Sequence, residues 1–293
     1  MTLVLSVLEQ GMIYAIMALG VYITYKILDF PDLTVDGSFP LGAAITAILI
    51  SKGVNPFLTL PICFVAGGVI GILTGIIHVK LRVRDLLSGI IMMTALYTVN
   101  LRIAGRANVP FYSADTIFDN AFINAVIPES LAQYRPVIVI FVLTLLMKYI
   151  LDWYLRTKSG MLLRAVGDNP TLITSLGIDK GFVKIVGLAL ANALVTLSGC
   201  IFAQQQRFFD ASFGTGTVVI GLASVIIGTS LFKKVTFVRV TSSVVIGSLL
   251  YKGCVALAVR FGMGSSDVKL VRAVLFLIVL GVSMDRKKVS ADA

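Results

Sequence analysis

Two loops of the chain place an acidic residue and a serine directly ahead of a short apolar segment. One loop reads Asp36-Gly37-Ser38-Phe39-Pro40-Leu41-Gly42, and the other reads Asp210-Ala211-Ser212-Phe213-Gly214-Thr215-Gly216. Carboxylate and hydroxyl oxygens at such positions can accept hydrogen bonds from the free N–H groups that begin a helix. The same groups can line a polar path through apolar surroundings. Both interpretations of Asp36 and Asp210 remain open from the sequence.

Polar residues also interrupt apolar stretches elsewhere in the chain. Together with the two aspartates, the candidate path residues are Ser38, Thr94, Asn100, Asn192, Thr196, Ser198 and Ser212. The alternative is that these side chains only hydrogen-bond one helix to another. Four tyrosines could stack against a flat apolar solute or form belts at a membrane interface, namely Tyr14, Tyr22, Tyr25 and Tyr97.

The residue types argue against catalysis and metal binding by the chain. A single histidine, His78, excludes a histidine-based metal site or charge-relay triad. The three cysteines, Cys63, Cys200 and Cys254, lie in apolar runs and resemble small hydrophobic residues there. We therefore predict no catalytic residue and no bound metal, and we expect the chain not to be an enzyme.

The composition indicates what kind of elements position these residues. Hydrophobic residues make up 57% of the 293 residues, charged residues 14%, and the mean hydropathy is +0.96. An ordinary globular chain has about 25% charged residues, so this chain has too few to cover a soluble surface. The composition excludes a soluble enzyme, a disordered chain and a disulfide scaffold. It predicts an all-α, multi-pass membrane protein.

Apolar runs set the number of predicted membrane helices, because about 20 apolar residues cross the hydrocarbon layer. The long runs are Gly11–Leu28, Phe57–Val79, Leu86–Ala104, Val137–Leu155, Phe182–Ala203, Val238–Ala258 and Lys269–Met284. Two runs are shorter, Phe39–Ser51 and Thr215–Phe232. We therefore expect about eight to nine helices that span the membrane fully or by half. Short or interrupted segments mark the working region of many transporters.

Basic residues orient these helices, because cytoplasmic loops collect Lys and Arg. With Lys26, four clusters hold most of the 25 basic residues: Lys80/Arg82/Arg84, Arg156/Lys158/Arg164/Lys180/Lys184, Lys233/Lys234/Arg239 and Arg286/Lys287/Lys288. Placing all of them inside puts the C-terminus inside, and the N-terminus and the 105–135 loop outside. The net charge of +10 is then explained by orientation, so we expect no nucleic-acid partner.

The two aspartate loops predict an internal repeat. Both follow the pattern Asp-small-Ser-Phe-x-x-Gly, and Val69-Ile70-Gly71 is matched by Val245-Ile246-Gly247 at nearly the same offset. We expect two copies, about 10–105 and 181–285, with opposite orientations in one domain that covers 1–293. Inverted repeats of this kind are common in transporters, with the path between the copies.

A long basic loop, 156–181, lies between the predicted copies. Within it Asn169 suits a helix N-cap and Pro170 the first helical position, and Gly177 suits a left-handed stop. These signals predict a short helix over Thr171–Leu176. Leu172, Ile173 and Leu176 share one face of it, which either packs on the protein's own loops or docks in a partner's groove.

At this loop the sequence resembles a known family. Arg164-Ala165-Val166-Gly167-Asp168-Asn169-Pro170, followed by Gly177-Ile178, resembles the inward-loop signature of permease subunits of ATP-binding cassette (ABC) importers. The branch is the one that contains branched-chain amino acid and ribose permeases. Asp32-Leu33-Thr34-Val35-Asp36-Gly37-Ser38-Phe39 resembles its second conserved block. Within the branch, the chain most resembles aromatic amino acid (tryptophan/tyrosine) permeases.

The resemblance implies a function and a set of partners. The loop helix would be a coupling helix in a cleft of a cytoplasmic ATPase, through Arg164, Gly167, Asp168, Asn169, Pro170, Leu172, Ile173, Leu176 and Gly177. The chain has no Gly-x-x-x-x-Gly-Lys-Ser/Thr motif, so ATP and Mg²⁺ would bind to the partner ATPase and no cofactor to this chain. The other implied partners are a second copy of the chain and an extracellular or periplasmic solute-binding protein at the outer loops 106–135 and 207–214. The location would be the bacterial cytoplasmic membrane.

A second class of function also fits the repeat and the short helices. An ion-coupled secondary transporter or channel would use Asp32, Asp36 and Asp210 as ion ligands. Such a protein has no need of the 167–177 loop, which is the feature that favours the importer.

Overall fold

The computed structural model describes residues 2–175, 177–233, 239–260 and 268–289. Within these ranges seven helical segments are long and apolar enough to cross a membrane: Val4–Ile27, Pro56–Val79, Asp85–Ala104, Leu131–Tyr154, Lys180–Gln206, Ala211–Leu231 and Val240–Arg260. Two further apolar helices are shorter, Val35–Ser51 and Leu270–Gly281. The prediction of an all-α membrane protein with eight to nine spanning or half-spanning helices is therefore confirmed.

The helices follow one another with short connections. The first group is α1 (Thr2–Tyr22), the π-helical turn η1 (Ile23–Ile27), α2 (Val35–Ser51), α3 (Pro56–Val79) and α4 (Asp85–Ala104). The middle of the chain forms β1 (Asn108–Pro110), α5 (Ala121–Val126), the 3-10 helix η2 (Glu129–Tyr134), α6 (Arg135–Tyr154), α7 (Lys158–Asp168) and α8 (Pro170–Ser175). The last group is α9 (Lys180–Gln206), β2 (Phe208–Asp210), the 3-10 helix η3 (Ala211–Gly214), α10 (Thr217–Leu231), α11 (Val240–Arg260) and α12 (Val268–Val289).

Three predicted segments differ in extent from the observed helices. The run predicted as short, Thr215–Phe232, is lengthened by η3, so that Ala211–Leu231 is long enough to span. The last run, Lys269–Met284, lies within the longer helix α12, Val268–Val289, whose apolar part in the described residues is Leu270–Gly281. α2 begins four residues before the predicted Phe39, which places Asp36 in its first turn rather than ahead of it.

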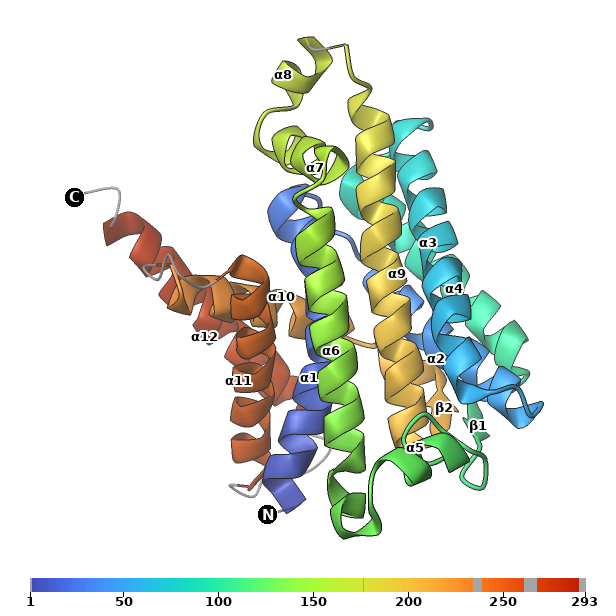
Figure 1. Ribbon diagram of the computed structural model, residues 1–293. Coiled ribbons are helices and arrows are strands. Elements are labelled where there is room, and N and C mark those ends of the chain that lie inside the picture. Colours follow the sequence, from blue (N-terminus) through green and yellow to red (C-terminus); the bar gives the residue numbers. More distant parts are fainter. Residues whose placement is uncertain (1, 176, 234–238, 261–267, 290–293) are drawn as a thin grey trace.

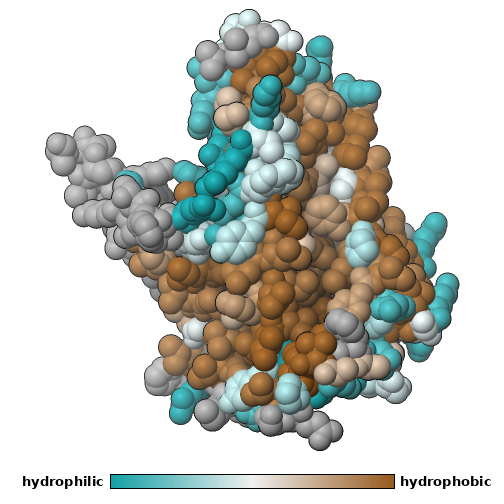
Figure 2. Space-filling view, in the orientation of Figure 1, coloured by the Kyte–Doolittle hydropathy of each residue, from teal (hydrophilic) through white to brown (hydrophobic). Residues whose placement is uncertain are grey.

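The molecule has two polar ends and an apolar middle. In Figure 1, α7 and α8 form one end, and α5 with β1 and β2 forms the other, where the N-terminus also lies. Figure 2 shows hydrophobic side chains over the surface between these ends. The basic 156–184 loop marks the first end as the inner one, as the charge distribution predicts. The N-terminus therefore lies at the outer end.

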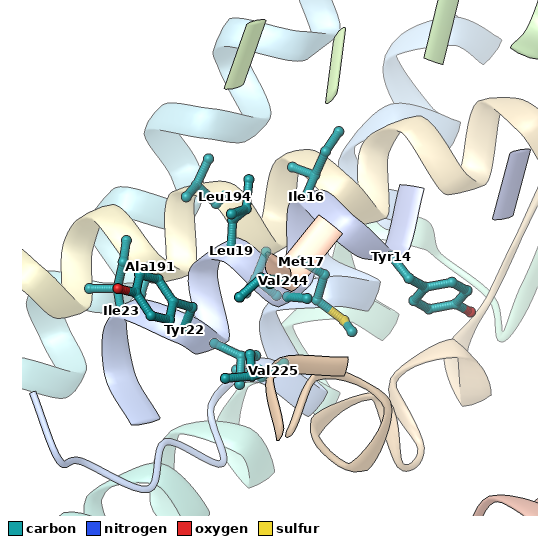
Figure 3. Packing of buried hydrophobic residues seen from close by; sticks show 14 of the residues in the cluster. Tyr14, Ile16, Met17, Leu19, Tyr22, Ile23, Ala191, Leu194, Val225 and Val244 are labelled. Atoms are coloured by element: carbon teal, nitrogen blue, oxygen red, sulfur yellow. The ribbon is translucent and has the colours of Figure 1, made fainter. Parts of the chain in front are cut away.

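Helix α9 is the central helix, and glycines on α3 let the two helices pack closely. An added Cβ at Gly67 would overlap the Asn192 carbonyl, and one at Gly71 would overlap the Leu188 carbonyl. Gly75 meets Ile185 one turn further on. Figure 3 shows the other side of α9, where Ala191 and Leu194 face Leu19 and Ile16 of α1. Small residues such as the glycines of α3 allow the backbones of membrane helices to approach closely.

The helices α1–α4 and α9–α12 pack in the same order. In the first set, α1 packs on α10 and α11 of the second set. In the second set, α9 packs on α2 and α3 of the first. Each short helix also contacts the last helix of its own set, α2 on α4 and α10 on α12. Glycines again mediate the contact in the second set, where Gly228 lies against the Ser243 carbonyl. The first helix of each group, α1 and α9, therefore packs mainly on helices of the other group.

A small antiparallel sheet joins two segments at the outer end. β1 pairs with β2 so that Val109 lies opposite Phe209. The all-α prediction did not include these strands, each of which has three residues. They connect the 105–135 loop to the link between α9 and α10.

Candidate functional site

The Asp36 carboxylate begins the candidate site, and it caps a helix far from its own in the sequence. Its Oδ1 accepts hydrogen bonds from the Val218 backbone N–H and the Thr217 hydroxyl, both at 2.8 Å. Its Oδ2 accepts the Gly216 N–H at 3.1 Å. These donors begin α10, whereas Asp36 itself lies in the first turn of α2. The interpretation of Asp36 as a cap for the helix that follows it was therefore wrong.

The short helices α2 and α10 start at this carboxylate and run to opposite ends of the molecule. The far end of α2 packs at the outer end, where Ile50 shares a cluster with Val109 and Phe209. The far part of α10 packs through Gly228 on Ser243, close to the inner end of α11. Helix N-termini carry partial positive charge, so one carboxylate between two of them is favourable. We refer to Asp36 and the α10 residues 216–218 as the helix junction.

A second polar cluster ties the loop before α2 to the central helix. The Asn192 amide donates to Asp32 Oδ2 at 2.9 Å, and the Ser38 hydroxyl donates to Asn192 Oδ1 at 2.6 Å. Asp32 Oδ1 also accepts the Thr34 N–H at 2.9 Å. All four residues are at most 5% exposed. Two predicted path residues, Ser38 and Asn192, are thus bonded to each other, and Asn192 is also bonded to Asp32.

The remaining predicted path residues are spread over the molecule. Asn100 of α4 is buried and donates to the Gly37 carbonyl at 3.1 Å, which brings it to the helix junction. Thr94 lies on the exposed face of α4 and bonds to its own helix at the Ile90 carbonyl. At the outer end, Asp210 Oδ1 accepts the Ser212 N–H at 2.7 Å and so caps its own turn, η3, while its Oδ2 accepts the Asn108 amide of β1 at 3.3 Å.

The inner loop has the capped helix that the sequence predicts. Asn169 Oδ1 accepts the Thr171 N–H at 3.2 Å at the start of α8, and Gly177 has a left-handed φ of 75°. Ile173 is only 1% exposed and packs in the main core, so this side chain meets the protein itself. The Leu172 side chain and Leu176 lie outside the described residues. Arg164, Asp168 and Asn169 are exposed and available to a partner.

Helix α7 precedes this short helix and was not predicted. Thr157 caps it by accepting the Gly160 N–H at 3.3 Å, and Leu163 and Val166 are buried beneath it. The signal in the sequence was a threonine ahead of apolar residues at helical spacing. An added Cβ at Gly167 would overlap the Ile27 carbonyl of η1. The inner loop is thus seated directly on the inner end of α1.

A polar cavity of about 480 Å³ opens beside this contact at the inner end. Its lining includes Lys26 and Arg164, together with Asp152 of α6 and Arg239. Asp152 is ion-paired to Arg239 at 3.0 Å and to Lys148 at 3.1 Å. The buried Asp152 carboxylate is thus shared by two cations beneath the coupling region, which leaves the cluster with one net positive charge.

At the outer end, Arg207 joins two loops that the sequence assigned to one docking surface. Its guanidinium donates to Asp119 Oδ2 at 3.0 Å and to the Tyr112 carbonyl at 2.8 Å. Hydrogen bonds from Arg207 and then from Asn124 lower the pKa of the Asp119 carboxyl below its usual value. The 106–135 and 207–214 loops thus form one surface.

No group of three or more His, Cys, Asp or Glu side chains that could hold a metal ion is present within the described ranges. The arrangement is instead one of helix caps, interhelical hydrogen bonds and two polar ends. These contacts hold the helices in position relative to one another.

Comparisons with known proteins match this arrangement over nearly the whole chain. A family model described as "Branched-chain amino acid transport system / permease component" matches residues 3–283. A tyrosine transport system permease protein of Clostridioides difficile is 40% identical, over 98% of this chain and 95% of its own. The ribose import permease protein RbsC of Escherichia coli K12 is 27% identical, over 97% of this chain and 85% of its own.

A solved structure shows a similar fold. It is that of PsaBC from Streptococcus pneumoniae in complex with Fab, with a TM-score of 0.52 and 13% sequence identity. The match covers 93% of this chain and 89% of that chain.

Proposed function

The chain belongs to the family of permease components of branched-chain amino acid transport systems, and on that premise we propose that it imports an aromatic amino acid such as tyrosine. It is the permease component of an ABC transport system and a multi-pass protein of the bacterial cytoplasmic membrane. As a transport subunit it is not an enzyme. The aromatic substrate is supported by the relative that is named for tyrosine and is 40% identical.

The family implies ATPase and solute-binding partners, and we propose how they assemble here. Two ATPase subunits, which carry the ATP and Mg²⁺, bind at the inner end over the exposed residues of α7 and α8. The solute-binding protein docks on the outer surface that Arg207 and Asp119 join. A second copy of the chain completes a two-fold permease. Lipid surrounds the apolar band seen in Figure 2.

The proposed mechanism depends on the contact between Gly167 of α7 and Ile27 of η1. Closure of the ATPase subunits would push on α7, and the absence of a side chain at Gly167 leaves no compressible layer between α7 and η1. The chain continues from η1 through the 28–34 loop to Asp32 and Asp36. Motion at the inner loop would therefore reach the helix junction, where α2 and α10 meet.

The alternative of an ion-coupled transporter finds less support in the same residues. Asp32 and Asp36 already accept hydrogen bonds from other parts of the chain, and Asp210 accepts from its own turn. Each of the three carboxylates is thus explained by a structural contact. The coupling loop, in contrast, is explained by an ATPase partner.

Uptake of tyrosine into proteoliposomes tests the proposed function. With the permease, its ATPase and its binding protein reconstituted together, we expect radiolabelled tyrosine to accumulate only when ATP is present. Phenylalanine and tryptophan should compete for uptake, and ribose and leucine should not. Accumulation driven by a proton or sodium gradient without ATP would contradict the importer. Competition by ribose or leucine alone would contradict the aromatic substrate.

Deletion of Asn169–Leu176 tests the coupling loop. We expect the variant to insert in the membrane but to lose co-purification with the ATPase by at least about tenfold, because the docking surface is removed. The matched control is Ile173→Ala, which removes the buried contact of this loop and keeps its exposed residues. That control should lower stability by about 2–5 kcal/mol and still bind the ATPase. A deletion variant that binds the ATPase as well as the wild type would exclude this role.

A further inference from the structure

Lys252 is a lysine buried within the membrane-spanning helix α11. It is 8% exposed, its Nζ lies 3.2 Å from Gln10 Oε1, and it lies 4.0 Å from the ring centroid of Tyr14. Neither contact supplies a negative charge. The ion pairs within the described ranges involve other cations, namely His78, Lys148, Arg207 and Arg239. In the part of the chain that the structure describes, Lys252 thus has no carboxylate partner.

A second buried lysine shows how the chain treats such a charge elsewhere. Lys148 of α6 is also 8% exposed, and it forms an ion pair with Asp152 at 3.1 Å. A charge at membrane depth is costly, so buried cations usually have a partner or a function. The contrast between Lys148 and Lys252 indicates that the partner of Lys252 is not a residue of the described chain.

Two more hydrogen-bond donors lie around Lys252. Arg272 of α12 is close enough to Lys252, Tyr14 and Tyr251 to interact electrostatically with each of them. Tyr251 is 1% exposed, and its buried hydroxyl has no hydrogen-bond partner among the residues that the structure describes. A buried hydroxyl without a partner is costly. Lys252 and the unpaired Tyr251 hydroxyl on α11, together with the positive charge of Arg272 on the neighbouring helix α12, therefore match an acceptor with negative charge.

An aromatic cluster adjoins these donors. The Tyr14 ring stacks on Phe39 with centroids 5.8 Å apart and an angle of 6°, and it lies 5.6 Å from the Phe202 ring. Phe213 continues the cluster at 5.1 Å from Phe202. In Figure 3 the Tyr14 side chain lies at one end of the packed core, away from Tyr22 and Ile23. Tyr14 thus contacts both the Lys252 ammonium group and the aromatic cluster.

We propose that Lys252, Arg272 and the Tyr251 hydroxyl bind the carboxylate of the amino acid that is transported, with the Tyr14 cluster beside its aromatic side chain. A carboxylate has only acceptor atoms and a negative charge, which complements three groups that can all donate. The inference rests on the proposed function, since it assumes an amino acid as solute. We call these three residues the carboxylate site.

The substitution Lys252→Met separates this role from a structural one. Methionine is nearly isosteric, and replacing a buried, unneutralised charge with an apolar group is neutral or stabilising for the fold. We expect an unchanged or higher thermal midpoint, ATPase stimulation by the loaded binding protein within about twofold of wild type, and tyrosine uptake reduced by about tenfold to a hundredfold. Tyr251→Phe should reduce uptake in the same direction with the fold intact.

Lys148→Met is the matched control. It removes a lysine of equal burial that is paired with a carboxylate, Asp152, which it shares with Arg239, so it should lower the thermal midpoint and leave uptake per folded molecule near that of wild type. Wild-type uptake by the Lys252→Met complex would overturn the carboxylate site while tyrosine import by the wild type still stood. If the wild type takes up another solute, the same comparison is made with that solute. A solute without a carboxylate would overturn the carboxylate site together with the proposed substrate.

Discussion

Replacing Asp36 with alanine is expected to abolish uptake and to destabilise the permease by about 3 kcal/mol or more. The substitution leaves the Gly216 and Val218 N–H groups and the Thr217 hydroxyl without their acceptor at the start of α10. Each buried donor that loses its acceptor lowers the stability of the fold by about 1–3 kcal/mol. Few water molecules can reach a half-buried junction between helices to replace the lost acceptor. Thermal unfolding of the purified protein in detergent and uptake into proteoliposomes would measure the two effects.

Two variants make the Asp36 prediction specific. Asp36→Asn keeps an oxygen acceptor and should retain most of the stability, because asparagine is as good a helix cap as aspartate. Asp210→Ala changes the equivalent aspartate of the second loop, which caps its own short turn and otherwise accepts only an exposed hydrogen bond from Asn108, and should cost about 1 kcal/mol. Equal losses for Asp36→Ala and Asp210→Ala would contradict the role of the helix junction.

The second large effect is expected from Gly71→Ala on α3. An added Cβ would overlap the Leu188 carbonyl and lie 2.6 Å from the Ala189 Cα, and these atoms belong to the backbone of the central helix α9. Moving α3 and α9 apart to make room for the new Cβ would also break their close contacts at Gly67 and Gly75. We expect a loss of about 3 kcal/mol or more, at the upper end of what overpacking costs in a close-packed core. The yield of folded protein and its thermal midpoint would show it.

The control for this prediction lies on the same helix. An added Cβ at Gly68 meets only the Ala189 carbonyl, at 3.9 Å, which is an ordinary contact. Gly68→Ala should therefore be neutral or stabilise the protein by up to about 1 kcal/mol, because alanine favours the helix. If both variants lose stability to the same degree, the close α3–α9 contact is not what Gly71 provides.

The membrane class, the helices and the capped loop could be predicted because they depend on local sequence. Apolar runs define the helices whatever lies beside them, since the lipid surrounds all of them alike. Asn169 and Gly177 act on backbone groups only a few residues away, so their pattern alone predicts the ends of α8. Basic residues similarly mark the inner end without any knowledge of packing.

Some features that the sequence analysis missed depend on segments that meet only in the folded protein. β1 and β2 are too short to show a strand pattern, and they form because the chain brings Val109 opposite Phe209. Helix α7 has a local signal at Thr157, and its place in the protein is decided by the contact between Gly167 and Ile27. Thr94 was grouped with Asn100 by polarity, and only the packing of α4 distinguishes an exposed residue from a buried one.

The clearest division between sequence and structure is at the two matching loops. By itself the sequence determined that Asp36 and Asp210 each lie near the start of a short helical segment, because a repeated local pattern is visible without a fold. Only the tertiary structure decided that Asp36 caps α10 across the molecule while Asp210 caps its own turn. The same holds for Lys252, whose lack of a carboxylate partner among the described residues depends on what α1 and α12 place beside it. The physical reason is that hydrogen-bond and charge partners are set by distance in space, and an exchange of first helices brings together residues far apart in the chain.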